Sequence, residues 1–140
     1  MERWVVYAFV SMFFAGLTAV VAKQGLAGIS GELGLAVRTL FVCFFVLIFA
    51  LATTAFAEVH TLRQTNVIWL GASALTTALS WIFYYKALKD GEVSVIALID
   101  KGSVVVAVLL AWLLLKETVT PRALLGAVLV AAGLIVIAKK

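Results

Sequence analysis

Residues 93–115 read VSVIALIDKGSVVVAVLLAWLLL, a run in which only Asp100 and Lys101 are charged. A helix needs about 20 apolar residues to cross the ~30 Å hydrocarbon core of a bilayer, and this run is long enough to do so. Charged side chains inside a membrane span are costly, so they need a partner or a water-filled cavity and usually serve a function. The run therefore predicts a transmembrane helix with a polar position inside it.

Four further apolar stretches resemble this one. The last of them is short, but Thr120 can act as its N-cap and Pro121 can take the first helical position, which extends the helix back to about residue 122. The chain has 140 residues, of which 65% are hydrophobic and 13% charged. A soluble domain averages about 25% charged residues. We predict an all-α integral membrane protein with a single transmembrane domain over residues 1–140. Its five spans are Trp4–Ala22, Gly34–Ala57, Val67–Tyr85, Val93–Leu115 and Leu124–Ala138.

The basic residues between the spans fall almost evenly on the two sides of the membrane. We call the side of the N-terminus face A and the opposite side face B. Face A carries Arg3, Arg63, Lys116 and Arg122, and face B carries Lys23, Lys86, Lys89, Lys139 and Lys140. Placing Arg38 near face B leaves the bias weak. Because the Lys/Arg bias normally fixes orientation, this near balance predicts insertion both ways round. Two inverted copies would rebuild the inverted-repeat plan of many transporters.

Arg38, Asp100 and Lys101 are three charged residues that lie inside the spans, where apolar residues would be expected. Spans two and four both begin at face B, so a rise of ~1.5 Å per residue places Arg38 roughly 6 Å and Asp100 roughly 10 Å into the membrane. We therefore predict that Arg38 and Asp100 form an ion pair, either direct or bridged by water. Such a pair fits two roles equally well, fixing helix packing or forming a polar site on a transport path.

No arrangement typical of an enzyme occurs in the sequence. It has no Ser/His/Asp set, no metal-ligand spacing and no nucleotide-binding loop. The single histidine, His60, is placed in a surface loop, and the single cysteine, Cys43, is interpreted as a small hydrophobic residue within span two. We expect no enzymatic activity, no cofactor, no metal and no nucleic-acid partner.

Several short motifs together resemble a known family. Residues 81–94 read WIFYYKALKDGEVS, residues 99–103 read IDKGS, and residues 115–117 read LKE, followed by Thr120. Gly126 and the pair 132–133 supply small residues in span five, and Lys23 and Arg38 also match. This ordered set resembles the EamA domain of the drug/metabolite transporter superfamily, and specifically its short single-domain prokaryotic members. The resemblance covers essentially the whole chain.

The resemblance implies a five-helix module of an inverted-repeat transporter. Most relatives fuse two modules of opposite topology into ten helices around a central cavity, and they move small metabolites or amino acids, often outward. By analogy we expect a secondary transporter in the inner or plasma membrane of a prokaryote that works by alternating access. It would act as an inverted homodimer, or pair with another five-helix module. The candidate substrate-binding residues are Arg38, Trp81, Tyr84, Asp100, Lys101 and Ser103.

Three other functions remain open at this point. The small multidrug resistance proteins also form inverted dimers, but they have four spans and a membrane-embedded glutamate in span one, whereas Trp4–Ala22 has no carboxylate. A non-transporting subunit that binds lipid or stabilises a partner is the main alternative. A membrane enzyme acting on lipid-linked substrates fits poorly, because clustered acid, base or metal groups are missing.

Overall fold

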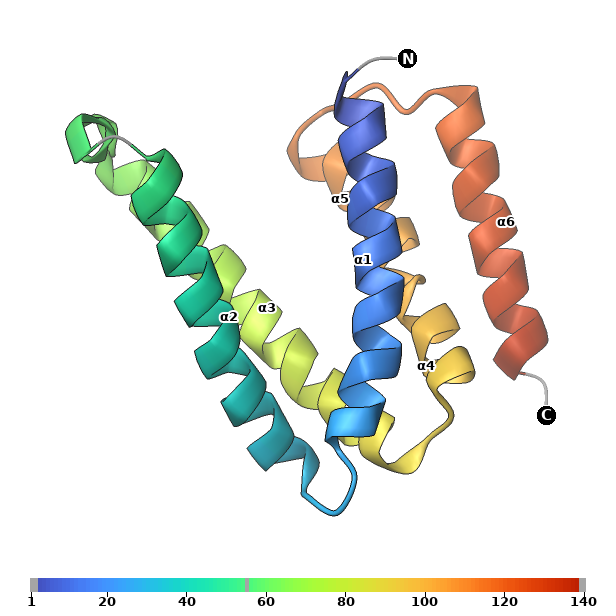
Figure 1. Ribbon diagram of the computed structural model, residues 1–140. Coiled ribbons are helices and arrows are strands. Elements are labelled where there is room, and N and C mark those ends of the chain that lie inside the picture. The colour runs from blue at the N-terminus through green and yellow to red at the C-terminus, as the bar shows by residue number, and fades with distance from the viewer. Residues whose placement is uncertain (1–2, 55, 139–140) are drawn as a thin grey trace. The chain divides into compact units, whose positions relative to one another are not determined.

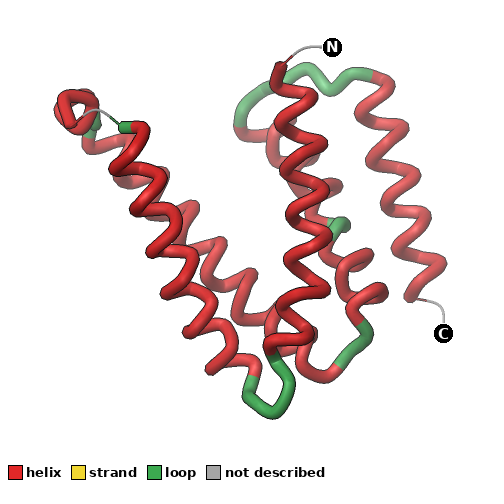
Figure 2. The backbone as a smooth tube through the Cα atoms, viewed as in Figure 1, coloured by secondary structure: helices red, strands yellow, loops and turns green. Residues whose placement is uncertain are grey.

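The computed structural model describes residues 3–54 and 56–138, and within them every regular element is helical (Figure 1, Figure 2). The helices Arg3–Gly25, Gly31–Thr53 and Gln64–Asp90 and the run from Val93 to Leu114 are long and apolar enough to cross a membrane, and the last helix, Pro121–Ala138, is apolar but shorter. The predicted all-α membrane class is therefore confirmed. The elements are α1 (Arg3–Gly25), α2 (Gly31–Thr53), the 3₁₀ helix η1 (Phe56–Thr61), α3 (Gln64–Asp90), α4 (Val93–Asp100), α5 (Ser103–Leu114) and α6 (Pro121–Ala138).

Large apolar side chains cover the helices on all sides. In α1 the consecutive residues Met12, Phe13 and Phe14 are all exposed, although neighbours along a helix point about 100° apart. A helix that is apolar all round requires lipid or protein around it. Most of this surface therefore has to face lipid or other protein surface, because few apolar residues of the described chain are buried, namely Ala19, Leu26, Tyr85, Leu88 and Ala127.

The chain divides into two compact units, residues 1–20 with 91–140 and residues 21–90. In the second unit α2 packs against α3, and the two helices lie side by side (Figure 1). In the first unit α6 packs against α5 and also contacts α4. The buried Ala127 belongs to the row of alanines in span five, where small side chains let helix backbones approach closely.

Side-chain caps fix where α2 and α6 begin. The Ser30 hydroxyl accepts a hydrogen bond from the Leu33 N–H at 3.2 Å, and Ser30 has the extended backbone of an N-cap. The Thr120 hydroxyl accepts from the Ala123 N–H at 3.2 Å, and Pro121 is the first residue of α6. The N-cap predicted at Thr120 is confirmed.

The second and third spans differ most from their predicted ends. The second span was predicted as Gly34–Ala57, but α2 runs from Gly31 to Thr53. It starts earlier because Ser30 caps it, and it stops earlier because Thr54 is extended, with Ala57 inside η1. The third span, predicted as Val67–Tyr85, continues as α3 to Asp90, so the polar residues that seemed to follow the span belong to its last turn.

The fourth span is interrupted where its two charges lie. It was predicted as one helix, but α4 ends at Asp100 and α5 starts at Ser103. Around the break the Gly102 N–H donates to the Ile99 carbonyl at 2.9 Å, and the Val104 N–H donates to the Lys101 carbonyl at 3.1 Å. These bonds join residues three apart, as in a 3₁₀ helix, and such a tightened stretch inside a helix often marks a functional hinge.

Candidate functional site

A close approach of α2 to α3 positions the first group of candidate residues. Gly31, in the first turn of α2, faces the backbone of α3. A Cβ atom added at Gly31 would lie 2.9 Å from the Tyr85 carbonyl oxygen and 3.2 Å from its carbon. Only a glycine lets the backbones meet at this distance, since real Cβ atoms do not come so close to backbone atoms. The first turns of α2 are thereby held against the last third of α3.

Two turns further along α2, Arg38 lies over the aromatic side chains of α3. Its Cζ atom is 4.3 Å from the centre of the Trp81 ring and 5.8 Å from that of the Tyr85 ring. A guanidinium group within about 6 Å of an aromatic face is attracted by the ring quadrupole. The Arg38 Nη1 atom is buried and has no hydrogen-bond partner. The aromatic rings thus hold the cation through its flat face, and the buried Nη1 donor remains without an acceptor.

The side chains around Arg38 are already engaged elsewhere. Lys86 and Glu32 form an ion pair at 3.6 Å, and their side chains are 55% and 65% exposed, so this is a surface pair. Tyr84 lies beside Tyr85, with ring centres 6.3 Å apart. Tyr85 is buried, whereas Tyr84 is half-buried. Within residues 21–90, as far as they are described, no carboxylate forms an ion pair with Arg38.

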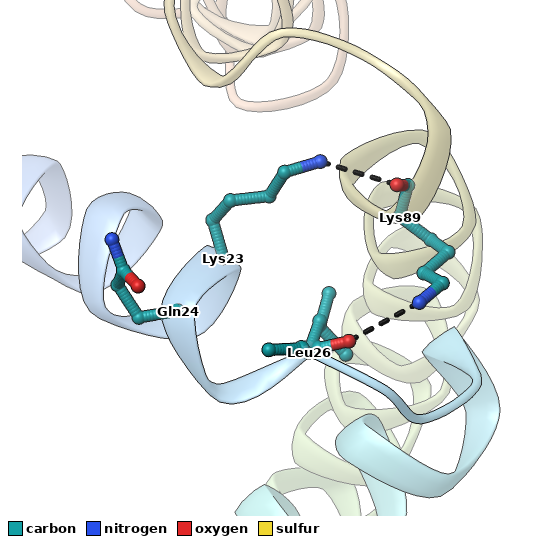
Figure 3. Close-up of a pocket in the computed structure, with 5 residues that line it drawn as sticks. Lys23, Gln24, Leu26 and Lys89 are labelled. Carbon is teal, nitrogen blue, oxygen red and sulfur yellow. Dashed lines mark hydrogen bonds between the residues drawn. The ribbon is translucent and has the colours of Figure 1, made fainter.

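A pocket of about 350 Å³ lies between the end of α1, the turn that follows it and the last turn of α3 (Figure 3). The Lys23 ammonium donates to the Leu88 carbonyl at 2.6 Å and to the Lys89 carbonyl at 3.1 Å. The Lys89 ammonium donates in return to the Leu26 carbonyl at 3.2 Å. The last carbonyls of a helix have no partner within the helix, so lysine side chains near its end can stabilise them. The pocket is lined by Lys23, Gln24, Leu26, Ala27 and Lys89.

The other candidate residues lie at the break between α4 and α5, in the other unit. Asp100 and Lys101 face each other at 3.8 Å, with side chains 42% and 50% exposed. Ser103 is the first residue of α5 and is exposed. A Cβ atom added at Gly102 would lie 2.7 Å from Leu134 of α6, so α6 packs directly on the break. An acid, a base and a hydroxyl are thus clustered where the helix changes its hydrogen-bond pattern.

The structure brings some of the predicted site residues together. Arg38 and Trp81 are in contact, and Asp100 adjoins Lys101. The predicted ion pair between Arg38 and Asp100 would join the two units and stays a prediction, as do the binding roles of all six candidates.

Tyr85 was missed as a neighbour of Arg38, because it was interpreted as part of an interfacial aromatic belt. A sequence signal for it did exist. Tyr85 follows Trp81 by four residues, and residues four apart share one face of a helix. The helical spacing alone would therefore have predicted that Tyr85 lies on the same face of the helix as Trp81.

Comparison with known proteins supports the family resemblance. A model of the EamA-like transporter family matches residues 2–139. A Sinorhizobium sp. protein described as "Uncharacterized transporter in cobO 3'region" is 31% identical over 137 residues, which make up 98% of this chain and 97% of that protein. No solved structure matches the chain. The chain is thus a multi-pass membrane protein and belongs to the EamA-like transporter family.

Proposed function

We propose that the protein is a secondary transporter of small metabolites or amino-acid-like compounds that works by alternating access. The observation that carries this proposal is the break in the fourth span at Lys101 and Gly102, beside the charge of Asp100. Many transporters bind substrates where a membrane helix is interrupted, and here the interruption lies beside an acid, a base and a hydroxyl group. A tightened segment between two helices also provides a place where the span can bend.

The proposed assembly is a dimer of antiparallel copies. Its support is the weak Lys/Arg bias between face A and face B, together with the large apolar surface that the described helices leave exposed. In a transporter built from inverted repeats the substrate site lies near the midplane, where the two repeats meet. A second, inverted copy would supply the second repeat. A different five-helix module in the opposite orientation would do the same.

Transport is tested with the purified full chain in liposomes. The vesicles are incubated with a defined mixture of amino acids and small organic acids, and the contents are measured by mass spectrometry. Saturable uptake of one class, absent from protein-free vesicles and reduced by Asp100→Asn or Lys101→Gln, is the expected result. Unchanged uptake in both variants would show that the residues at the break take no part in transport. No uptake of any solute would contradict the proposed transport function.

The lysine pocket favours a second function, a non-transporting subunit that binds an anionic lipid. Two ammonium groups, from Lys23 and Lys89, line one pocket between the end of α1 and the last turn of α3. Both already donate to carbonyl oxygens, which makes helix capping a sufficient role for them. The lipid-binding function predicts that an anionic lipid co-purifies with the protein and is lost in Lys23→Met, while no solute is taken up by the liposomes.

A further inference from the structure

Arg38 makes fewer hydrogen bonds than its partly buried position would lead one to expect. A guanidinium carries five N–H donors in a rigid fork. Trp81 and Tyr85 contact this group through their rings, which attract the cation but accept no conventional hydrogen bond in its plane. Nη1 is buried without a partner, although buried polar groups are almost always hydrogen-bonded. The group is therefore positioned as if for an acceptor that its own unit does not provide.

Glu32, the one carboxylate of α2, is not that acceptor in this arrangement. Glu32 extends to Lys86 at 3.6 Å and is mostly exposed, and no ion pair links it to Arg38. A membrane-embedded cation without a counter-ion is costly, so such residues generally mark substrate or ion pathways. An anion that arrives from outside the chain would satisfy both the charge and the unpaired donor.

We infer that Arg38, with Trp81 and Tyr85, binds the carboxylate group of a small organic monoanion. This inference rests on the proposed transport function and names its substrate class. Arginine matches a carboxylate with two parallel N–H···O bonds, which fix the orientation of the ligand as well as its charge. Trp81, which is only half-buried, adds apolar ring surface beside the anion, which suits a monocarboxylate with a hydrophobic remainder.

The charge at this end of the helix pair agrees with an anionic substrate. Around the last turns of α3, beyond the level of Arg38, three lysines (Lys23, Lys86 and Lys89) outnumber two carboxylates (Glu32 and Asp90), which leaves a net charge of +1. A surplus of one sign raises the local concentration of the oppositely charged solute. A monoanion is favoured over a dianion such as phosphate, because only one guanidinium is at hand and the cost of burying a charge rises steeply with its size.

The test uses the wild-type protein in nanodiscs and the reaction of arginine side chains with phenylglyoxal, followed at each arginine by mass spectrometry. Benzoate and benzamide are the probes, since they differ in charge but hardly in size. Benzoate at ten times its half-protecting concentration should slow the labelling of Arg38 about tenfold by mass action, and benzamide should not. Arg63 and Arg122, outside this cluster, are internal controls and should react equally fast throughout.

Three results would overturn the inference. Equal protection by benzoate and benzamide would show that charge is not recognised. Protection by inorganic phosphate but not by benzoate would exclude the monocarboxylate class. An Arg38 that reacts only in the Asp100→Asn variant would show that its donors belong to Asp100 of the protein itself.

The liposome assay separates this inference from the transport function. Benzoate protection without uptake of any solute would leave the carboxylate site standing and contradict the transporter. Uptake of neutral or cationic solutes without benzoate protection would do the reverse.

Discussion

Three lysines close to one another at the end of α3 have different roles in the structure. Lys23 and Lys89 donate to backbone carbonyls that end a helix or follow one, while Lys86 only pairs with Glu32 at the surface. Hydrogen bonds from a charged donor are worth about 1.5–3 kcal/mol, whereas exposed ion pairs are typically worth about 0–1 kcal/mol. Removing the positive charge of Lys23 or Lys89 should therefore reduce the stability more than removing that of Lys86.

Replacing Lys23 by methionine should destabilise the protein, because the Leu88 and Lys89 carbonyls lose their donor. We expect the free energy of unfolding to fall by about 1–2 kcal/mol, the usual range for such a bond in a half-exposed place. Lys86→Met is the matched control and should change it by less than about 0.5 kcal/mol. Unfolding in mixed micelles, followed by circular dichroism, measures both variants, and an equal loss in the two would contradict the capping role.

The contact between Arg38 and Trp81 predicts a second difference between variants. Trp81→Phe keeps an aromatic face under the cation, while Trp81→Leu keeps only apolar volume. A cation–π pair is worth about 0.5–2 kcal/mol depending on desolvation, so Trp81→Leu should be the less stable of the two by about 1 kcal/mol. The same unfolding assay applies. In an Arg38→Met background the difference should disappear, and its persistence there would assign it to packing alone.

At the scale of elements, glycines decide where helices meet. Gly31 lets α2 reach the α3 backbone at Tyr85, and Gly102 lets α6 place Leu134 against the break in span four. By contrast, a Cβ atom at Gly126 or Gly133 would have no close neighbour. Glycines of identical appearance in the sequence therefore differ in their tolerance of a methyl group.

Gly102→Ala should destabilise the protein even though alanine is the better helix former. The added methyl group would meet Leu134 at 2.7 Å and the Ile99 carbonyl at 2.9 Å. The leucine can move, but the carbonyl belongs to the backbone, so the turn itself must shift at a cost of about 1–3 kcal/mol. Gly126→Ala, in the interior of α6, should gain up to about 1 kcal/mol from helix propensity. A gain in both variants would mean that the fourth span forms an ordinary continuous helix.

The elements also separate what the sequence could predict from what it could not. The apolar segments and the Thr120 cap depend on local composition, which any window of sequence displays. The break at residues 101–102 was missed because the run 93–115 is long enough for one span and is apolar on both sides of residues 100–103, while the break involves the packing of Leu134 on Gly102. The contact of Arg38 with Tyr85 likewise depends on the approach of α2 at Gly31, which lies far from Tyr85 in the chain.

At the scale of the whole molecule, the balance of basic residues gives the proposed antiparallel dimer a direct test. Arg63→Gln with Arg122→Gln removes charge from face A and should fix one orientation, because the Lys/Arg excess then lies clearly on face B. Leu62→Lys and Thr118→Lys combined with Lys86→Gln, Lys139→Gln and Lys140→Gln should fix the other, because six basic residues then lie on face A against three on face B, Arg38 included. Reporter fusions that are active on only one side of the membrane verify each orientation.

If the working transporter needs two inverted copies, each of these orientation-fixed variants should lose uptake when it is produced alone. Their co-expression should restore uptake to near the wild-type level, because it supplies one copy of each orientation. The matched control is a pair of differently tagged copies of the same variant, which should stay inactive. Full activity of either variant alone would refute the antiparallel homodimer. Inactivity of the mixture, with both orientations verified, would instead require a different five-helix module as the partner, since neither copy then complements the other.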